Sequence, residues 1–196
     1  MYNGLEVIAG IILWPQRGRV EGIENLPPPP FVLALNHLTP YDPMLLILAL
    51  LPYLPKRKIF FLTQKEIALI FAPWQKLLGM IPASYRGLDR AAEYLQSGQL
   101  VGIFIMGAKS FFDTSKIRRY SGAAILAQKT GLPVVPVTVK GKPAYYCSFW
   151  RFLWRAARSL FEKKDFFVHP PIVFGTDSSI RETTNLILRI IESEEE

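Results

Sequence analysis

The chain has 196 residues with apolar residues spread evenly along it, which predicts a single domain with its own hydrophobic core. The 23 lysines and arginines against 16 aspartates and glutamates give a net charge of +7, which favours nucleic acid, anionic lipid or a phosphorylated small molecule as partner. Half of the residues are hydrophobic and the mean hydropathy is positive, so lipid is favoured over nucleic acid. The single cysteine, Cys147, excludes an internal disulfide, and we expect no metal site.

Two apolar stretches, residues 7–14 and 44–55, are candidates for membrane contact. Both are shorter than the roughly 20 residues that a spanning helix needs. Glu6 precedes the first stretch, which has neither a basic region before it nor a small-residue cleavage site, so we expect no signal peptide. We therefore expect peripheral attachment to the cytoplasmic face of a membrane, with residues 1–19 as a membrane-proximal segment and residues 20–196 as the catalytic domain.

Short apolar runs alternate with amphipathic segments along the chain. The first run follows the prolines at 27–30 and ends in polar residues, as expected for a buried strand that delivers His37 to the edge of a sheet. The expected strands are residues 31–37, 58–63, 80–83, 100–107, 132–141 and 166–174. The expected helices are a stretch after Pro43, one from about 64 to 78, and residues 88–97, 121–131, 148–164 and 178–191. This pattern predicts an α/β fold, a single layered domain in which helices flank a mostly buried mixed sheet.

His37 and Asp42 are the candidate acid-base pair. A histidine at a strand end can act as a general base, and a carboxylate on its second ring nitrogen would fix the tautomer and stabilise the imidazolium. A plain structural interpretation is also open, in which His37 is a loop residue and Asp42 only the N-cap of the helix that begins at Pro43.

The segments around this pair resemble the glycerolipid acyltransferase family, which includes the bacterial 1-acyl-glycerol-3-phosphate acyltransferases. VEGIENLP resembles the lead-in to the first conserved block of that family, and NHLTPYDP corresponds to its N-H-x-x-x-x-D block. LLGMIPASYRG, SGQLVGIFIMGAKS and VVPVTVKG resemble the second, third and fourth blocks, in that order. The resemblance covers residues 20–141 and implies a fold like that of glycerol-3-phosphate acyltransferase.

The resemblance implies O-acyl transfer from an acyl thioester, on coenzyme A or acyl carrier protein, to the hydroxyl of a lysophospholipid such as 1-acyl-glycerol-3-phosphate. His37 would be the base and Asp42 its partner, so neither a cofactor nor an enzyme nucleophile is needed, and Cys147 is a bystander. The substrate-binding residues implied are Asn36, Arg86, Gly107, Lys109 and Pro136. Arg86 and Lys109 would pair with the phosphate of the acceptor, although each can also be an ordinary solvated surface charge.

The third block departs from the family pattern F-P-E-G-T-R, because this chain has Met106 where the pattern has glutamate and Lys109 where it has arginine. A thioether cannot replace the charge of a carboxylate, and a lysine lacks the bidentate fork of arginine. Three interpretations follow: a lipid acceptor other than lysophosphatidic acid, the ordinary activity with a degenerate block, or a non-catalytic membrane-binding homologue.

Residues 148–164 interleave aromatic and basic side chains. Arg151, Arg155 and Arg158 fall on one face of a helix, and the aromatic residues spread over the rest. Such a helix can lie in a membrane interface with its rings among acyl chains and its arginines on phosphates, or it can be an ordinary surface helix that packs on the core. The expected contacts with an anionic membrane are Trp150, Arg151, Trp154, Arg155 and Arg158, and we expect no nucleic-acid partner.

Overall fold

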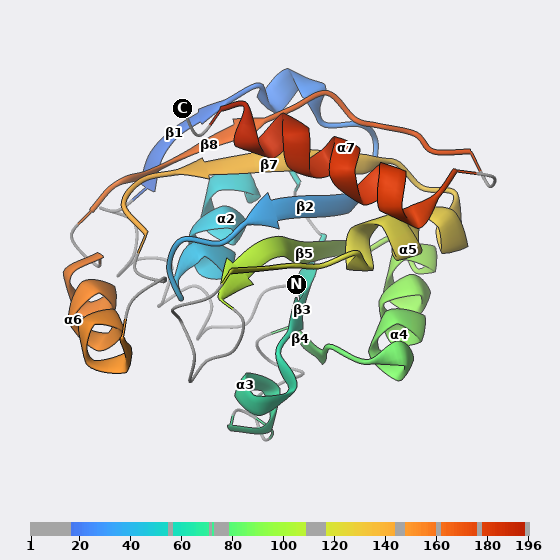
Figure 1. Ribbon diagram of the computed structural model, residues 1–196. Helices are drawn as coiled ribbons and strands as arrows, with labels where there is room; N and C mark the ends of the chain where they lie inside the picture. The colour runs from blue at the N-terminus through green and yellow to red at the C-terminus, as the bar shows by residue number, and fades with distance from the viewer. Residues whose placement is uncertain are drawn as a thin grey trace.

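A computed structural model describes residues 17–54, 57–70, 72, 79–108, 117–143, 148–159, 162–175 and 178–194. The described strands join one sheet with helices on both faces (Figure 1). These strands are β1 (Arg17–Glu21), β2 (Val32–Asn36), β3 (Ile59–Thr63), β4 (Met80–Pro82), β5 (Leu100–Ala108), β6 (Ile117–Arg119), β7 (Val134–Lys140) and β8 (Lys164–Val168). Their order is β1-β8-β7-β2-β5-β3-β4, with β6 paired to β5.

The middle of the sheet is parallel. β7, β2, β5, β3 and β4 run in the same direction, whereas β8 is antiparallel to β7, and β6 is antiparallel to β5. The expected mixed sheet is therefore confirmed. Because the five parallel strands end on the same side, the chain leaves all of them at one edge of the sheet, here named the carboxyl edge. β8 begins at this edge, since it runs in the opposite direction.

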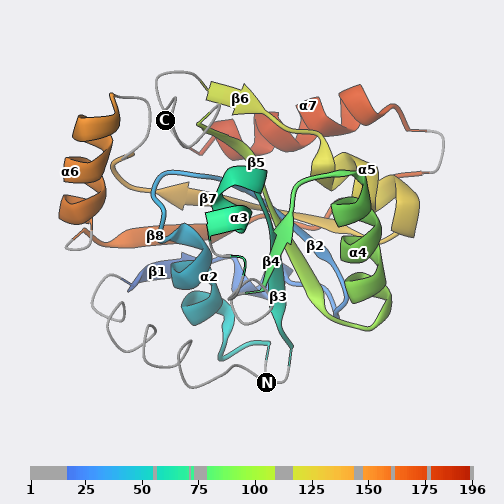
Figure 2. The ribbon, with the colours of Figure 1, turned by 90° about the horizontal axis from the view of Figure 1, so that it is seen from below.

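Alternating side chains of β2 supply the two halves of the core. Leu33 and Leu35 pack in the cluster that contains α2 (Asp42–Leu50), and Val32 and Ala34 pack in the cluster on the other face. That second face is covered by α4 (Tyr85–Gln96), α5 (Gly122–Thr130) and α7 (Ile180–Glu192). Figure 2 shows α2 on one side of the sheet and these three helices on the other. Because both faces of β2 are buried, its sequence is continuously apolar.

Two helices, α3 (Lys65–Ile70) and α6 (Phe149–Ser159), lie outside this layered core, and Figure 1 shows α6 standing apart from the sheet. A short 3₁₀ turn, η2 (Ile23–Asn25), links β1 to the prolines before β2. In the described part of the chain, every helix is too short or too polar to cross a membrane.

Several boundaries differ from those expected. α4 begins at Tyr85 rather than Leu88, because the Ser84 hydroxyl caps the helix by accepting from the Gly87 amide. β8 ends at Val168, ahead of two prolines, and Ile172 makes only an isolated bridge to the sheet. The expected helix over 148–164 ends at Ser159, and Lys164 is instead the buried first residue of β8.

Two strands were not expected from the sequence. β1 is rich in charged residues and pairs with β8, and β6 has only three residues. The boundary expected between residues 19 and 20 falls inside β1, so the sheet includes the chain from Arg17. The segment before it, residues 1–16, lies outside the described residues.

The start of α4 packs against the end of β4 through Gly87. A Cβ atom at Gly87 would collide with the backbone carbonyl oxygen of Pro82. We expect Gly87→Ala to lower the free energy of unfolding by about 2–3 kcal/mol, since the backbone must move to admit the methyl group. Urea denaturation followed by circular dichroism measures the change.

Gly131 provides the control for this prediction. It ends α5 with a φ of 68°, and an added Cβ would meet no atom within 4 Å. Gly131→Ala should therefore cost only about 1 kcal/mol, from the left-handed backbone alone. A Gly87→Ala variant no less stable than Gly131→Ala would contradict the packing argument.

Candidate active site

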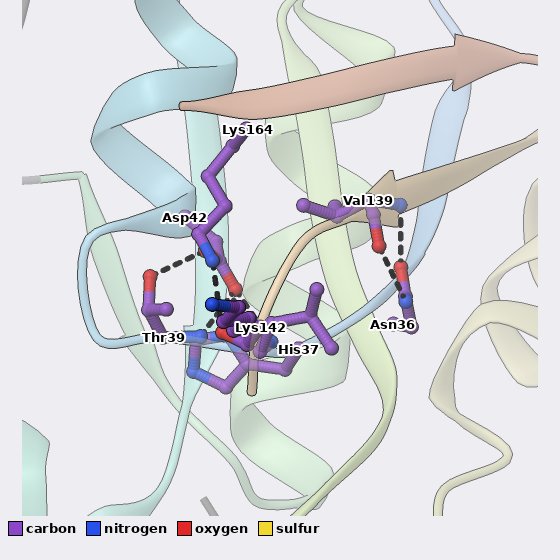
Figure 3. Close-up of polar contacts among 8 residues, drawn as sticks. Asn36, His37, Thr39, Asp42, Val139, Lys142 and Lys164 are labelled. Carbon is purple, nitrogen blue, oxygen red and sulfur yellow. Dashed lines mark hydrogen bonds and ion pairs between the residues drawn. The ribbon is translucent and has the colours of Figure 1, made fainter. Parts of the chain in front are cut away.

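His37 and Asp42 meet at the carboxyl edge, at the end of β2. His37 follows the last residue of this strand, and Asp42 is the first residue of α2. The chain turns between them, so the Nδ1 atom of His37 lies 3.1 Å from the Oδ2 atom of Asp42 (Figure 3). The cap position of α2 is occupied by Tyr41, so Asp42 is not the N-cap of this helix.

The Asp42 carboxylate is completely buried and surrounded by donors. Its Oδ2 atom accepts from the backbone amides of Leu38 at 2.6 Å and Thr39 at 2.8 Å, and its Oδ1 atom accepts from the Thr39 hydroxyl at 2.6 Å. Hydrogen bonds to a charged acceptor are among the strongest in proteins. These contacts hold the carboxylate in one orientation toward the imidazole.

This arrangement assigns the tautomer of His37. An ionised carboxylate can only accept, so the Nδ1 atom of His37 must be the donor in its contact with Asp42. The other ring nitrogen, Nε2, is then the one that can take a proton from a hydroxyl. The His37 side chain is 20% exposed, so a substrate can reach the ring from the carboxyl edge.

The His37 ring is also held by packing. Its centroid lies 4.1 Å from that of Phe104, at an interplanar angle of 32°, and Phe104 stacks in turn on Phe61. A Cβ at Gly107 would lie 3.5 Å from the His37 Cβ, so Gly107 borders the His37 side chain directly. Residues of β5 therefore hold the ring of His37 in place.

The side chain of Asn36, which we expected to bind substrate, is bonded to the backbone of β7. Its side chain is completely buried, its Nδ2 atom donates to the Val139 carbonyl at 3.0 Å, and its Oδ1 atom accepts from the Val139 amide at 2.7 Å. The carboxamide thus extends the pairing between β2 and β7 beyond the last backbone pair. It ties the strand end that carries His37 to β7.

The other expected binding residues are spread along the sheet. Pro136 is buried in β7 opposite Ala34, too deep to contact a substrate at the edge. Arg86 is exposed in the first turn of α4, and it makes no ion pair with any residue that the structure describes. Arg86 follows β4, three strands from β2, or about 14 Å at the usual strand spacing. Lys109 and Cys147 lie outside the described residues.

Lys164 is a site residue that the sequence did not reveal. Its side chain is 1% exposed, its Nζ atom donates to the Lys142 carbonyl at 2.9 Å, and Glu162 lies 3.9 Å away. In Figure 3 it extends from β8 toward Asp42. Burial lowers the pKa of the Lys164 ammonium from its ordinary value of 10.5, and the negative charges of Asp42 and Glu162 oppose this effect.

The sequence contains only weak signals for these additional residues. Thr39 precedes Asp42 by three positions, a spacing at which a hydroxyl can bond a neighbouring side chain. Phe104 is one of several apolar residues in its strand, and Lys164 lies in a run of charged residues. Within the described residues, no group of three or more His, Cys, Asp and Glu side chains could hold a metal ion.

The buried ammonium of Lys164 gives a prediction about pH. Between its lowered folded-state pKa and 10.5, the unfolded chain binds a proton that the folded chain does not, so raising the pH favours folding. The free energy of unfolding of the wild type, relative to Lys164→Met, should therefore rise as the pH is raised toward 10.5. The gain is about 1.4 kcal/mol for each unit by which the pKa is lowered.

The neighbouring Lys163 is exposed and serves as the matched control. The rise with pH should be larger for the difference between the wild type and Lys164→Met than for the difference between the wild type and Lys163→Met. Chemical denaturation at a series of pH values measures both differences. If the differences in free energy of unfolding between the wild type and each of the two variants changed with pH in the same way, Lys164 would not be buried as described.

Comparisons with known proteins identify the family and the fold of the chain. No curated protein matches the chain. A solved structure of PlsC, the 1-acyl-sn-glycerophosphate (LPA) acyltransferase from Thermotoga maritima, matches with a TM-score of 0.66 and 24% sequence identity, over 96% of this chain and 74% of that one. This likeness shows the fold. A model of the acyltransferase family matches residues 17–140, from β1 to the end of β7. The chain is an enzyme of the acyltransferase family.

Proposed function

We propose that this acyltransferase moves a fatty acyl group from an acyl thioester, on coenzyme A or acyl carrier protein, to the hydroxyl of a lysophospholipid such as 1-acyl-glycerol-3-phosphate. It would act in phospholipid biosynthesis or remodelling. The observation that carries the proposal is the His37 imidazole, whose Nδ1 is bound to the buried Asp42 carboxylate while Nε2 remains the basic nitrogen. This is the arrangement that a general base needs.

In the proposed reaction, Nε2 of His37 takes the proton of the acceptor hydroxyl as its oxygen attacks the thioester carbonyl carbon. The Asp42 carboxylate stabilises the imidazolium through the Nδ1 hydrogen bond. When the tetrahedral intermediate collapses, the bond between carbon and sulfur breaks and the leaving thiolate takes the proton back from the imidazolium. The products are the ester and a free thiol, and the base returns to its starting state.

The phosphate of the acceptor would bind cations at the carboxyl edge. Arg86 suits this role because it is exposed at this edge and has no ion-pair partner among the described residues. Lys109 would be the second cation. A guanidinium pairs with phosphate oxygens through two parallel hydrogen bonds, which fixes the orientation of the headgroup.

A second candidate is acyl transfer to a lipid hydroxyl other than that of lysophosphatidic acid. The observation that favours it is Met106, which is opposite Asn36 in the sheet and only 8% exposed. A buried thioether offers neither charge nor a strong acceptor to a polar headgroup. The half of the site that activates a hydroxyl is complete, whereas the half that selects the acceptor differs from the pattern of the resembling family.

We also propose that the enzyme binds peripherally to an anionic membrane, on its cytoplasmic face, through α6. Trp150 and Trp154 are 79% and 72% exposed, so these two rings do not pack on the core. Arg151, Arg155 and Arg158 are exposed as well. Exposed tryptophans interleaved with arginines suit the boundary between acyl chains and headgroup phosphates.

The general-base role predicts a loss of activity that is specific to the pair. His37→Ala should lower kcat/KM by about 10²- to 10⁴-fold. Asp42→Asn should lower it by up to about 10⁴-fold, because an amide has one acceptor oxygen where the carboxylate has two, and its NH2 group disturbs the tautomer of His37. Release of free thiol from an acyl thioester in the presence of lysophosphatidic acid measures the rate.

The other histidine of the chain is the matched control. His169 follows β8, and its Nε2 atom bonds at 2.8 Å to the Thr138 hydroxyl, which also donates to the Ile191 carbonyl of α7. It therefore lies under α7, on the other face of the sheet from α2 and the His37–Phe104 contact. His169→Ala should leave kcat/KM within about twofold, as for a site remote from the chemistry. If His37→Ala retained the wild-type rate in the folded protein, the proposed mechanism would be wrong.

A panel of acceptors tests the substrate. Lysophosphatidic acid should be the preferred acceptor, and Arg86→Gln should raise its KM by about tenfold or more while changing the KM for monoacylglycerol little. A preference for a neutral lipid hydroxyl in the wild type would support the second candidate instead. Failure of every acceptor with the wild-type enzyme would make the chain a non-catalytic lipid-binding homologue.

A further inference from the structure

The large apolar side chains that are most exposed in the described residues are not scattered. Tyr85 is 89% exposed, Trp150 79%, Leu69 75%, and Trp154 and Val173 72% each. Four of these five belong to helices that directly follow the parallel strands β3, β4 and β7. Large exposed apolar groups of this kind mark surfaces that contact a partner or a membrane.

The topology brings these four side chains to the carboxyl edge. Leu69 is in α3, a six-residue helix that starts two residues after β3 ends, and Tyr85 is the first residue of α4, after β4. Both tryptophans are in α6, which follows β7. In the strand order, β2 with His37 lies between β7 and β3, so α6 and α3 follow strands on the two sides of the catalytic strand.

The pictures agree with this placement. In Figure 1, α6, α3 and the beginning of α4 lie along the lower side of the molecule, and Figure 2, seen from below, shows α3 between the other two. A flat membrane surface can contact several helices on one side of a protein at once.

The charges of these helices suit an anionic surface. Arg86 is next to Tyr85, and Arg151, Arg155 and Arg158 are next to the tryptophans, all with exposed side chains. On α3 the exposed Lys65 and Glu66 offset one another, and Glu162 lies 3.8 Å from the Arg158 guanidinium. α4 has as many acidic as basic residues. The net positive charge of the described parts of these helices therefore comes from α6, and anionic headgroups attract it.

We propose that the carboxyl edge is a lipid-binding surface, in which Leu69 of α3 and Tyr85 of α4 enter the interface of an anionic bilayer together with α6. Contact at α6 alone would leave the enzyme free to rotate on the membrane. Contact at α3 and α4 as well fixes its orientation, with His37 toward the lipid. The inference rests on the proposed function only in taking the acceptor to be a membrane lipid.

Flotation with vesicles of phosphatidylglycerol and phosphatidylcholine tests this surface. Leu69→Ser combined with Tyr85→Ser should weaken binding about fivefold to thirtyfold, as expected for two apolar side chains withdrawn from the interface. Tyr53→Ser combined with Val173→Ser is the matched control. These residues are 48% and 72% exposed, but Tyr53 follows α2 and Val173 follows β8, at the opposite edge. The control should bind within about twofold of the wild type.

A second readout separates this inference from the proposed function. With a short-chain lysolipid dissolved below its micelle concentration, Leu69→Ser/Tyr85→Ser should keep the wild-type rate, whereas with the acceptor in vesicles its rate should fall in parallel with binding. Circular dichroism and thermal denaturation confirm that each variant is folded. A wild type that binds vesicles but acylates no acceptor would refute the proposed function and leave the lipid surface standing.

Three results would overturn the lipid surface. The first is equal binding of the two double variants to vesicles, and the second is binding of the wild type to neutral and anionic vesicles alike with no dependence on salt. The third is a dimer in solution, detected by sedimentation without lipid, that Leu69→Ser/Tyr85→Ser dissociates. That last result would assign the edge to a second copy of the chain.

Discussion

The carboxylate of Asp42 is completely buried, and its need for hydrogen-bond donors shapes the site around it. A buried charge is tolerated only when donors or opposite charges surround it. Here the donors come from the turn that leaves β2: the imidazole of His37 and the amides and hydroxyl of the next two residues. The turn cannot relax without exposing the charge, so the imidazole is positioned before any substrate binds.

β8 adds to this constraint because it is the strand that reverses direction. β8 is antiparallel to β7, so it begins where the parallel strands end. This places its first residue, Lys164, at the same edge as His37 and Asp42. Its ammonium holds the segment after β7 through the Lys142 carbonyl, where a side chain at Gly141 would collide with it. The hydrogen bond from Lys164 to the Lys142 carbonyl thus fixes which segments meet beside Asp42.

The carboxyl edge carries both the His37–Asp42 pair and the exposed apolar side chains of α3, α4 and α6. In a parallel sheet the loops at the carboxyl ends carry the functional groups, while the strands provide the rigid support. In this chain the loop after β2 holds His37, β5 supplies the ring and the glycine that border it, and the helices after β3, β4 and β7 carry the most exposed apolar groups at this edge. The proposed acyl transfer and the proposed contact with lipid therefore lie on the same side of the domain.

Met106 and Phe104 show that neighbouring residues of one strand serve opposite faces of the sheet. Met106 lies in β5, and its side chain packs with the apolar cluster beneath α4, α5 and α7. His37 instead packs against Phe104, on the other face of that strand. Met106 therefore leaves the contact between His37 and Phe104 undisturbed, since its side chain packs on the opposite face of the sheet.

The sequence alone predicted the layered α/β fold, most of its strands and helices, and the pairing of His37 with Asp42, because these depend on residues close together in the chain. Apolar runs, helical periodicity and a five-residue turn are local patterns. Tertiary structure decided the strand order, the inclusion of β1 and β6, the use of Asn36 to pair with Val139, and the burial of Lys164. Asn36 and Val139, like Lys164 and Asp42, are more than 100 residues apart in sequence, and a polar residue shows its role only when its distant partner is in place.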